Sequence, residues 1–484
     1  MTSAPVTRAG IEAARTPGRR RWTALALLAA AQLMLVLDVT VVNVALPDIG
    51  ASLHLTRAEL PWVLTAYTVV FGGLMLLGGR IADRYGARRL TLTGLVVFTG
   101  ASLLSGLAAG PAGLLAGRAL QGAGAALLSP AALAAVLTMF SGRDRTRALG
   151  VWSGLAGLGS ALGVILGGVL TSEASWRWIF AVNVPIGAAL LVAVPLIVPA
   201  GRPGTGPAGT SGSDVPGGLD IPGGLLVTAG TGAAIYGLIN AGTSGWTAPS
   251  TLGAFAVAVL AWAAFAGVER RAASPLLAVG LLRRRPVTAG GFLMLVATGL
   301  LVGAFFFGSF SLQHADGYSA LRVGLSFIPV AAAIVAGAHT AGRVLARVPA
   351  RTVAVAGLAL AGAGYGTAAL WPWPAQSVTG MSIASLGLGG CFVTAFTASL
   401  ADAPAAEGGL RSALVNTFHE LGGAAGVAAL STVAGAAMVA ARPAASAFRG
   451  AFTAGAAFAL AAAVIAAFLV PSVLRGADGG RPAH

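Results

Sequence analysis

The sequence predicts an all-α integral membrane protein with fourteen transmembrane helices. The 484 residues are 56% hydrophobic and 9% charged, with a mean hydropathy of +0.85, whereas a soluble domain carries about 25% charged residues. Apolar runs long enough to cross a bilayer, which takes about 20 residues, recur along the whole chain. The 30 basic residues are all arginine, and they cluster between these runs.

The apolar runs also determine the expected topology. An even number of spans puts both termini on one side, and assigning that side to the cytoplasm places 24 of the 30 arginines there, as the positive-inside rule requires. The absence of lysine beside abundant Ala and Gly suggests a GC-rich bacterial genome. We therefore expect a multi-pass protein of a bacterial cytoplasmic (inner) membrane with both termini cytoplasmic. The predicted spans are 22–46, 60–79, 90–109, 112–140, 148–170, 178–198, 221–241, 250–268, 287–312, 322–345, 352–371, 376–399, 412–438 and 451–471.

A linker separates the first six spans from the remaining eight. The segment 199–220 is rich in Gly, Pro, Ser and Thr, a composition that does not build a packed core. The segments Gly79–Arg88 and Gly342–Arg351 agree at five of ten positions, which indicates two related halves. The predicted parts are a cytoplasmic tail 1–21, a six-helix bundle 22–198, the cytoplasmic linker 199–220, two inserted helices 221–268, a second six-helix bundle 287–471 and a cytoplasmic tail 472–484.

Two charged residues lie inside the apolar spans of the first bundle. Asp38 is in the first span, where a carboxylate costs about 2.5–3.5 kcal/mol on insertion scales and is expected to face the bundle interior. Such a buried carboxylate can take up and release a proton. Arg118 is in the fourth span, with Gln121 one turn further on the same face. Asp38 is the natural partner for this guanidinium, although Arg118 could instead extend to a membrane interface.

A second acidic residue, Glu420, lies in the thirteenth span. Asn416 is one turn before it on the same face, whereas His419 is rotated by about 100° and faces elsewhere. Two interpretations remain open for Glu420. It is either a second proton or cation site, or a solvated carboxylate near the cytoplasmic end of its helix.

The most specific pattern follows the second span, in the segment Gly79–Leu92. A short connection between two helices needs Gly86 for its backbone freedom, Asp83 can neutralise a helix end, and the arginines can anchor at lipid headgroups. Charge that merely sets the topology would look similar. The pattern resembles the cytoplasmic signature of the major facilitator superfamily, except that Ala87 stands where that family usually has a basic residue. The resemblance implies a charge latch, made in one transport state and released in the other, that involves Gly79, Asp83, Arg84, Gly86 and Arg88.

The fifth span carries a glycine ladder. Gly159, Gly163 and Gly167 are spaced four residues apart, so they form a smooth stripe that lets another helix approach closely. With Gly168, the ladder resembles the antiporter motif of the same superfamily, although Val164 replaces the usual proline. Generic packing of small residues would produce a similar stripe.

Further segments make the resemblance more specific. Leu37-Asp38-Val39-Thr40 through Pro47, Asp220–Gly223 and Asn416–Gly423 resemble the fourteen-span drug:proton antiporters of that superfamily, over nearly the whole chain. The resemblance implies the major facilitator fold and a secondary transporter that exports hydrophobic or cationic small molecules, drugs and antibiotics among them, by alternating access. It implies no cofactor, the proton gradient as energy source, and a monomer as the functional unit. The expected partners are a small-molecule substrate, protons and the lipid bilayer.

Polar and aromatic side chains in the spans are candidates for lining a substrate cavity. Aromatic residues in membrane helices also face lipid or packed neighbours, and this alternative stays open for each of them. The candidates are Asn43, Tyr67, Gln121, Phe306, Phe310 and Asn416.

Other classes of function find little support in the sequence. The arginines do not gather on one folded surface, which argues against nucleic-acid binding. A Walker loop, a zinc-ligand spacing and a Ser-His-Asp arrangement are all missing from the sequence, so we expect neither an enzyme nor a metal site. Two rival functions remain: export of an endogenous metabolite or lipid by the same mechanism, and a membrane sensor that transports nothing.

Overall fold

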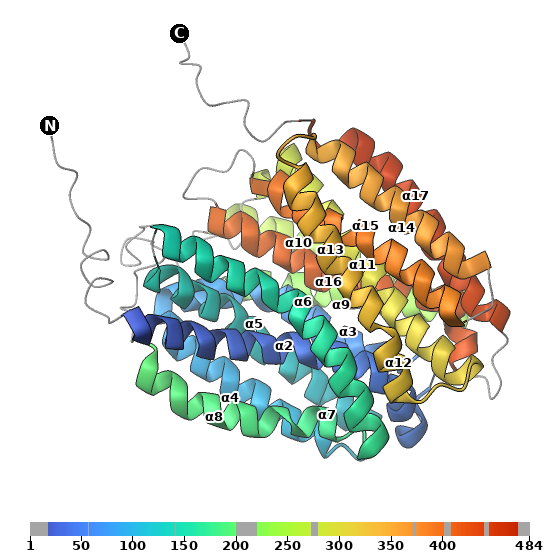
Figure 1. Ribbon diagram of the computed structural model, residues 1–484, viewed down its shortest axis with the longest axis horizontal. Coiled ribbons are helices and arrows are strands. Elements are labelled where there is room, and N and C mark those ends of the chain that lie inside the picture. Colours follow the sequence, from blue (N-terminus) through green and yellow to red (C-terminus); the bar gives the residue numbers. More distant parts are fainter. Residues whose placement is uncertain are drawn as a thin grey trace, which may run out of the picture.

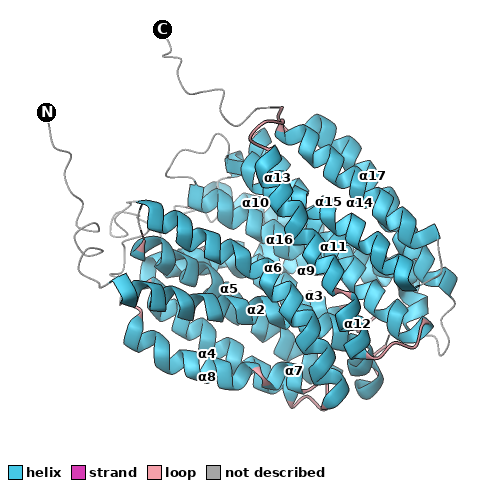
Figure 2. Cartoon of the chain, viewed as in Figure 1, coloured by secondary structure: helices cyan, strands magenta, loops and turns pink. Residues whose placement is uncertain are grey.

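The computed structural model describes residues 18–56, 58–140, 142–199, 220–272, 279–370, 374–400, 408–439 and 445–472. Within these ranges every regular element is a helix, which confirms the predicted all-α class (Figures 1 and 2). Most of the predicted linker 199–220 and most of the two tails, 1–21 and 472–484, lie outside the described residues.

Each predicted span corresponds to one long helix or to two consecutive helices. Twelve helical spans in the described ranges are long and apolar enough to cross a membrane. The fifth and thirteenth predicted spans correspond to two further helices of 32 residues each, α6 and α16. The helices are α2 (Gly18–Leu53), α3 (Trp62–Tyr85), α4 (Ala87–Gly106), α5 (Pro111–Met139), α6 (Gly142–Glu173), α7 (Trp178–Ala181), α8 (Asn183–Ile197), α9 (Ile221–Ser244), α10 (Pro249–Arg271), α11 (Arg285–Phe310), α12 (Ala320–Ser326), α13 (Ile328–Val344), α14 (Ala350–Leu370), α15 (Pro374–Leu400), α16 (Gly408–Val439) and α17 (Ala445–Leu469).

Two spans that the sequence predicts as continuous are interrupted. The sixth breaks at Val182, between α7 and α8, and the tenth breaks at Phe327, between α12 and α13. Pro185 and Pro329 follow the two breaks. Since proline has no N–H, neither residue can donate a hydrogen bond to the carbonyl four residues earlier. Each break therefore falls in the helical turn just before a proline, where one backbone hydrogen bond is missing.

Two bundles lie side by side (Figure 1). In the first, α5 packs against α3 and α4, and α2 packs against α6. In the second, α15 packs against α13 and α14, and α11 packs against α16. The division of the chain at the linker 199–220 stays a prediction.

The inserted helix α9 packs at the seam between the two bundles. Ile235 and Ile239 of α9 share an apolar cluster with Val69 of α3 and with Ala424 and Ala428 of α16. Helix α10 packs on α9, and only 11% of its most apolar stretch is buried. Helix α9 thus covers one side of the seam, and α10 stays largely exposed.

One end of the molecule is closed by contacts between the bundles. An apolar cluster that we name the apolar seal joins the last turns of α2 to α11, and includes Ile49, Phe180, Phe306 and Phe310. Beside the seal, the Gln313 side chain donates a hydrogen bond to the Val44 carbonyl over 2.9 Å. The backbone N–H of Leu321 donates to Ser172 Oγ over 3.0 Å. Both bonds join the first bundle to the second at this end.

Candidate functional site

Asp38 and Arg118 form an ion pair inside the first bundle. Asp38 of α2 is 2% exposed and Arg118 of α5 is fully buried. The guanidinium Nη1 donates to Asp38 Oδ2, and its Nε donates to the carbonyl of Val63 over 2.8 Å. The alternative in which Arg118 extends to a membrane interface is therefore wrong, because the side chain lies within the helix bundle.

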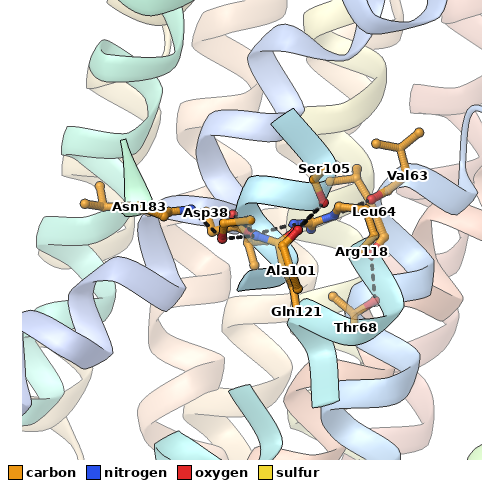
Figure 3. A network of polar contacts seen from close by, with 12 residues as sticks. Asp38, Val63, Leu64, Thr68, Ala101, Ser105, Arg118, Gln121 and Asn183 are labelled. Atoms are coloured by element: carbon orange, nitrogen blue, oxygen red, sulfur yellow. Dashed lines mark hydrogen bonds and ion pairs between the residues drawn. The ribbon is translucent and has the colours of Figure 1, made fainter. Parts of the chain in front are cut away.

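Neutral polar side chains complete the surroundings of the carboxylate (Figure 3). Asp38 Oδ1 accepts hydrogen bonds from Gln121 Nε2 over 2.9 Å and from Asn183 Nδ2 over 3.0 Å. Both amides also approach Ser102 Oγ, at 2.8 and 3.4 Å. Gln121 Oε1 in turn accepts from Arg118 Nη1 over 2.9 Å. We refer to Asp38, Ser102, Arg118, Gln121 and Asn183 as the Asp38 cluster.

Aromatic rings enclose the guanidinium of Arg118. Its carbon lies 4.6 Å from the centre of the Tyr67 ring and 5.8 Å from that of Phe180, distances at which a cation is attracted to a ring face. Tyr67 is itself fully buried. In the part of the chain that the structure describes, Arg118 Nη2 and the Tyr67 hydroxyl have no hydrogen-bond partner. Two buried polar groups beside the ion pair thus make no hydrogen bond to the described residues.

Two glycines allow α5 to carry these side chains between its neighbours. A Cβ at Gly117 would lie 2.3 Å from Ser105 Oγ of α4, and a Cβ at Gly122 would lie 2.4 Å from the Tyr67 carbonyl oxygen of α3. Any larger residue at either position would push the helices apart. The close approach places Arg118 and Gln121 within reach of Asp38.

Ser102 and Asn183 both contribute to the cluster, although neither is among the site residues predicted from the sequence. Asn183 is the first residue of α8, and its amide is buried. Its polar side chain within an otherwise apolar span is the sequence feature that could have identified it. Ser102 carried no such signal, because serine is common among the small residues of membrane helices.

The structure brings together only some of the cavity candidates. Tyr67 and Gln121 lie beside the ion pair, whereas Phe306 and Phe310 lie in the apolar seal. Asn43 is buried on α2 and donates to the Val39 carbonyl over 2.9 Å. Asn416 is half-buried on α16. Their role in lining a substrate cavity stays a prediction.

Glu420 lies against the first bundle. A Cβ at Gly72 of α3 would be 2.8 Å from the Cβ of Glu420, and the Glu420 side chain is half-buried. His419 faces elsewhere, since its Nδ1 lies 2.9 Å from Thr298 Oγ1 of α11. Helix α16 begins at Gly408, so at 1.5 Å per residue Glu420 is about 18 Å from that end. No hydrogen bond or ion pair of its carboxylate to another described residue is found.

The segment predicted as a latch forms the turn between α3 and α4. Gly86 has a φ of 96°, a left-handed conformation that favours glycine, and its N–H donates to the Ala82 carbonyl over 2.9 Å. Asp83 and Arg84 are exposed, and Arg88 is half-buried. Helix α3 approaches α5 most closely at Gly78, where an added Cβ would lie 2.0 Å from the Ala126 carbonyl oxygen. At Gly79, by contrast, the nearest atom to an added Cβ is 3.9 Å away, so Gly79 does not make a tight helix contact. The latch itself stays a prediction.

The glycine ladder of α6 faces α2. A Cβ at Gly163 would lie 1.8 Å from Thr40 Oγ1, and one at Gly167 would lie 2.9 Å from the Val41 carbonyl oxygen. The ladder therefore lets α6 approach the helix that carries Asp38. The other two members meet Val36 of α2 (Gly159) and Leu321 of the second bundle (Gly168).

A Gly163→Ala variant is expected to lower the apparent Tm of the purified protein by several degrees, because overpacking typically costs about 1–3 kcal/mol. The added methyl group collides with Thr40 Oγ1, so the double variant with Thr40→Ala should recover part of the loss. The matched control is Gly100→Ala, where a Cβ meets nothing within 4 Å. Equal Tm values for Gly163→Ala and Gly100→Ala would contradict the helix contact.

Comparison with known proteins agrees with this architecture. A model of the Major Facilitator Superfamily matches residues 28–427. The chain is 38% identical over 438 residues to a puromycin resistance protein of Streptomyces alboniger, covering 87% of this chain and 83% of the relative. It is 39% identical over 479 residues to a cephamycin export protein of Amycolatopsis lactamdurans, covering 95% and 94%.

Solved structures support the fold alone, because their sequences are distant. A peptide transporter in complex with sulfate aligns with a TM-score of 0.66 at 17% identity, covering 95% of this chain and 97% of that one. An inward-facing bacterial homologue of the human lysosomal transporter Spinster gives 0.64 at 18% identity, covering 94% and 98%. Because the family model matches residues 28–427 and two relatives are 38% and 39% identical over most of their length, this protein belongs to the Major Facilitator Superfamily of membrane transporters.

Proposed function

We propose that this protein exports antibiotics or similar hydrophobic or cationic small molecules across a bacterial inner membrane in exchange for protons. Relatives that cover most of the chain are named for resistance to puromycin and for export of cephamycin. The observation that carries proton coupling is the Asp38–Arg118 pair, because a carboxylate buried in a membrane bundle beside a permanent cation can be neutralised by one proton.

In the proposed cycle, a proton from outside neutralises Asp38 and weakens its pairing with Arg118. Substrate from the cytoplasm binds as that proton leaves inward, and rocking of the two bundles then exposes the substrate to the outside. Each charge that moves inward contributes about 2.3 kcal/mol per 100 mV of membrane potential. No cofactor is needed, and a monomer with both termini cytoplasmic is the functional unit.

We assign the end closed by the apolar seal to the extracellular side. The arginine distribution supports this assignment, because the opposite end carries the turn Arg80–Arg89 between α3 and α4. With the seal closed, Asp38 is shielded from the outside. Opening of the seal would then admit the external proton and release the substrate.

The test is transport by the purified protein in proteoliposomes. With an imposed pH gradient, we expect accumulation of labelled puromycin or of another member of an antibiotic panel, and collapse of the gradient by an uncoupler should stop it. Counterflow without a gradient separates the rivals, since a sensor shows none. An exporter of an endogenous metabolite or lipid would show counterflow only with compounds outside the antibiotic panel.

Glu420 is proposed as a second proton or cation site that faces the first bundle. A Glu420→Gln variant should lower the number of protons exchanged per substrate by one, because its side chain cannot change charge. The measurement is the pH gradient that just balances a known substrate gradient. A balance point that matches the unmodified protein would show that Glu420 does not take part in the exchange.

A further inference from the structure

The carboxylate of Asp38 is held by three donors from two helices. Arg118 and Gln121 come from α5, where they are one turn apart, and both also contact each other. The third donor, Asn183, comes from α8 and is 3% exposed. Figure 3 shows its amide approaching Asp38 from the side opposite to Arg118. Asn183 thus fixes Oδ1 independently of the helix that carries the counter-charge.

We propose that Asn183 is a positioning residue for proton exchange: its amide holds Oδ1 of Asp38 and stabilises the deprotonated carboxylate in the orientation that faces Arg118. This inference rests on the proposed function, in which Asp38 carries the proton. Asn183 touches neither proton nor substrate, and it acts through Asp38.

The hydrogen-bond pattern defines the state that Asn183 favours. An ionised carboxylate only accepts hydrogen bonds, whereas a protonated one must also donate. Asn183 Nδ2 donates to Asp38 Oδ1 and lies 3.4 Å from Ser102 Oγ, while Gln121 Nε2 makes the same pair of contacts. Oδ1 is therefore surrounded by donors. The pattern is that of the deprotonated carboxylate, the form that pairs with Arg118.

The other charged and titratable groups near Asp38 do not replace this contribution. Arg118 of α5 is directed at Oδ2, and Tyr67 of α3 packs under the guanidinium. Glu420 of α16 lies against Gly72 of α3. Helix α4 contributes the neutral Ser102. Removing Asn183 would thus take away one of the two amide donors to Oδ1 while leaving the counter-charge in place.

The experiment compares Asn183→Leu with a matched control in proteoliposomes. Leu has the same number and branching of side-chain heavy atoms and no donor. The control is Asn240→Leu in α9, where the amide likewise donates to two oxygens, those of Ser250 and Thr251 at 2.8 and 2.9 Å, away from Asp38. We expect Asn183→Leu to slow efflux driven by a pH gradient roughly tenfold or more, the scale of one hydrogen bond to a charged group. Asn240→Leu should leave it within about twofold of the unmodified rate.

Counterflow separates positioning from a general structural defect. It should persist in Asn183→Leu, because substrate exchange without net proton movement does not require Asp38 to bind and release a proton. Loss of counterflow together with driven efflux would assign Asn183 a purely structural role and overturn the proposal, as would unchanged driven efflux.

Combination with Asp38→Asn completes the test. If Asn183 acts through Asp38, adding Asn183→Leu to Asp38→Asn should reduce driven efflux no further, because interacting residues are not additive. Asp38→Asn that retains driven efflux would refute the proposed function itself. Asp38→Asn that loses driven efflux while Asn183→Leu keeps it would refute this inference alone.

Discussion

An Asp38→Asn variant is expected to lose efflux driven by a pH gradient while retaining substrate counterflow. The amide is nearly isosteric with the carboxylate, so the fold should persist, but it cannot bind and release a proton. Substrate exchange without net proton movement does not require that step. Driven efflux should fall by about 100-fold or more, on the scale at which proton transfer by a positioned side chain contributes.

Both rates would be measured in the same proteoliposome preparation, with Asp220→Asn as the control. Asp220 is a second buried carboxylate, but it caps α9 by accepting from the Gly223 N–H over 2.8 Å. Asn is an equally good helix cap, so the control should keep driven efflux and Tm. Gradient-driven accumulation that persists in Asp38→Asn would exclude Asp38 as the proton carrier.

An Arg118→Leu variant is expected to destabilise the protein. Removing the guanidinium leaves a carboxylate buried without its counter-charge, and breaking a buried ion pair in this way costs about 3–5 kcal/mol. The Val63 carbonyl and Gln121 Oε1 also lose their donor. The apparent Tm in detergent should fall by roughly 5 °C or more, and driven efflux should be lost.

The double variant Asp38→Asn/Arg118→Leu isolates the cause. It removes both charges of the pair, so the apparent Tm should rise above that of Arg118→Leu, while driven efflux stays absent. If the double variant is no more stable than Arg118→Leu alone, the loss comes from packing against Tyr67 and Phe180 rather than from the unpaired carboxylate.

Much of the fold could be predicted because membrane insertion imposes a strong local signal. Every predicted span overlaps a helix, since a helix that crosses a bilayer needs one long apolar run whatever its neighbours. The breaks at Val182 and Phe327 were not predicted. The missing proline hydrogen bonds weaken the helix there, but other prolines, such as Pro47 and Pro130, lie inside unbroken helices.

The candidate site was predictable only in part, because the sequence signal of membrane insertion marks charged residues but not neutral ones. Asp38 and Arg118 stand out because an uncompensated charge in an apolar span is costly, so each implies a partner. Asn183 and Ser102 are far from Asp38 in sequence and neutral, so no comparable cost marks them. Their contribution depends on where α4 and α8 pack, which hydropathy does not determine.

The apolar runs by themselves determined the fourteen helical spans, and the charges inside them marked Asp38 and Arg118 as residues that need a partner. Those features are local, because transfer of each segment into lipid depends on its own composition. The tertiary structure alone decided that two amides donate to Asp38 and meet at a serine hydroxyl, that Glu420 lies against the first bundle, and that α9 covers the seam. Helix packing brings these residues together from distant parts of the chain, and it depends on the shapes of the paired surfaces rather than on the hydropathy of either helix.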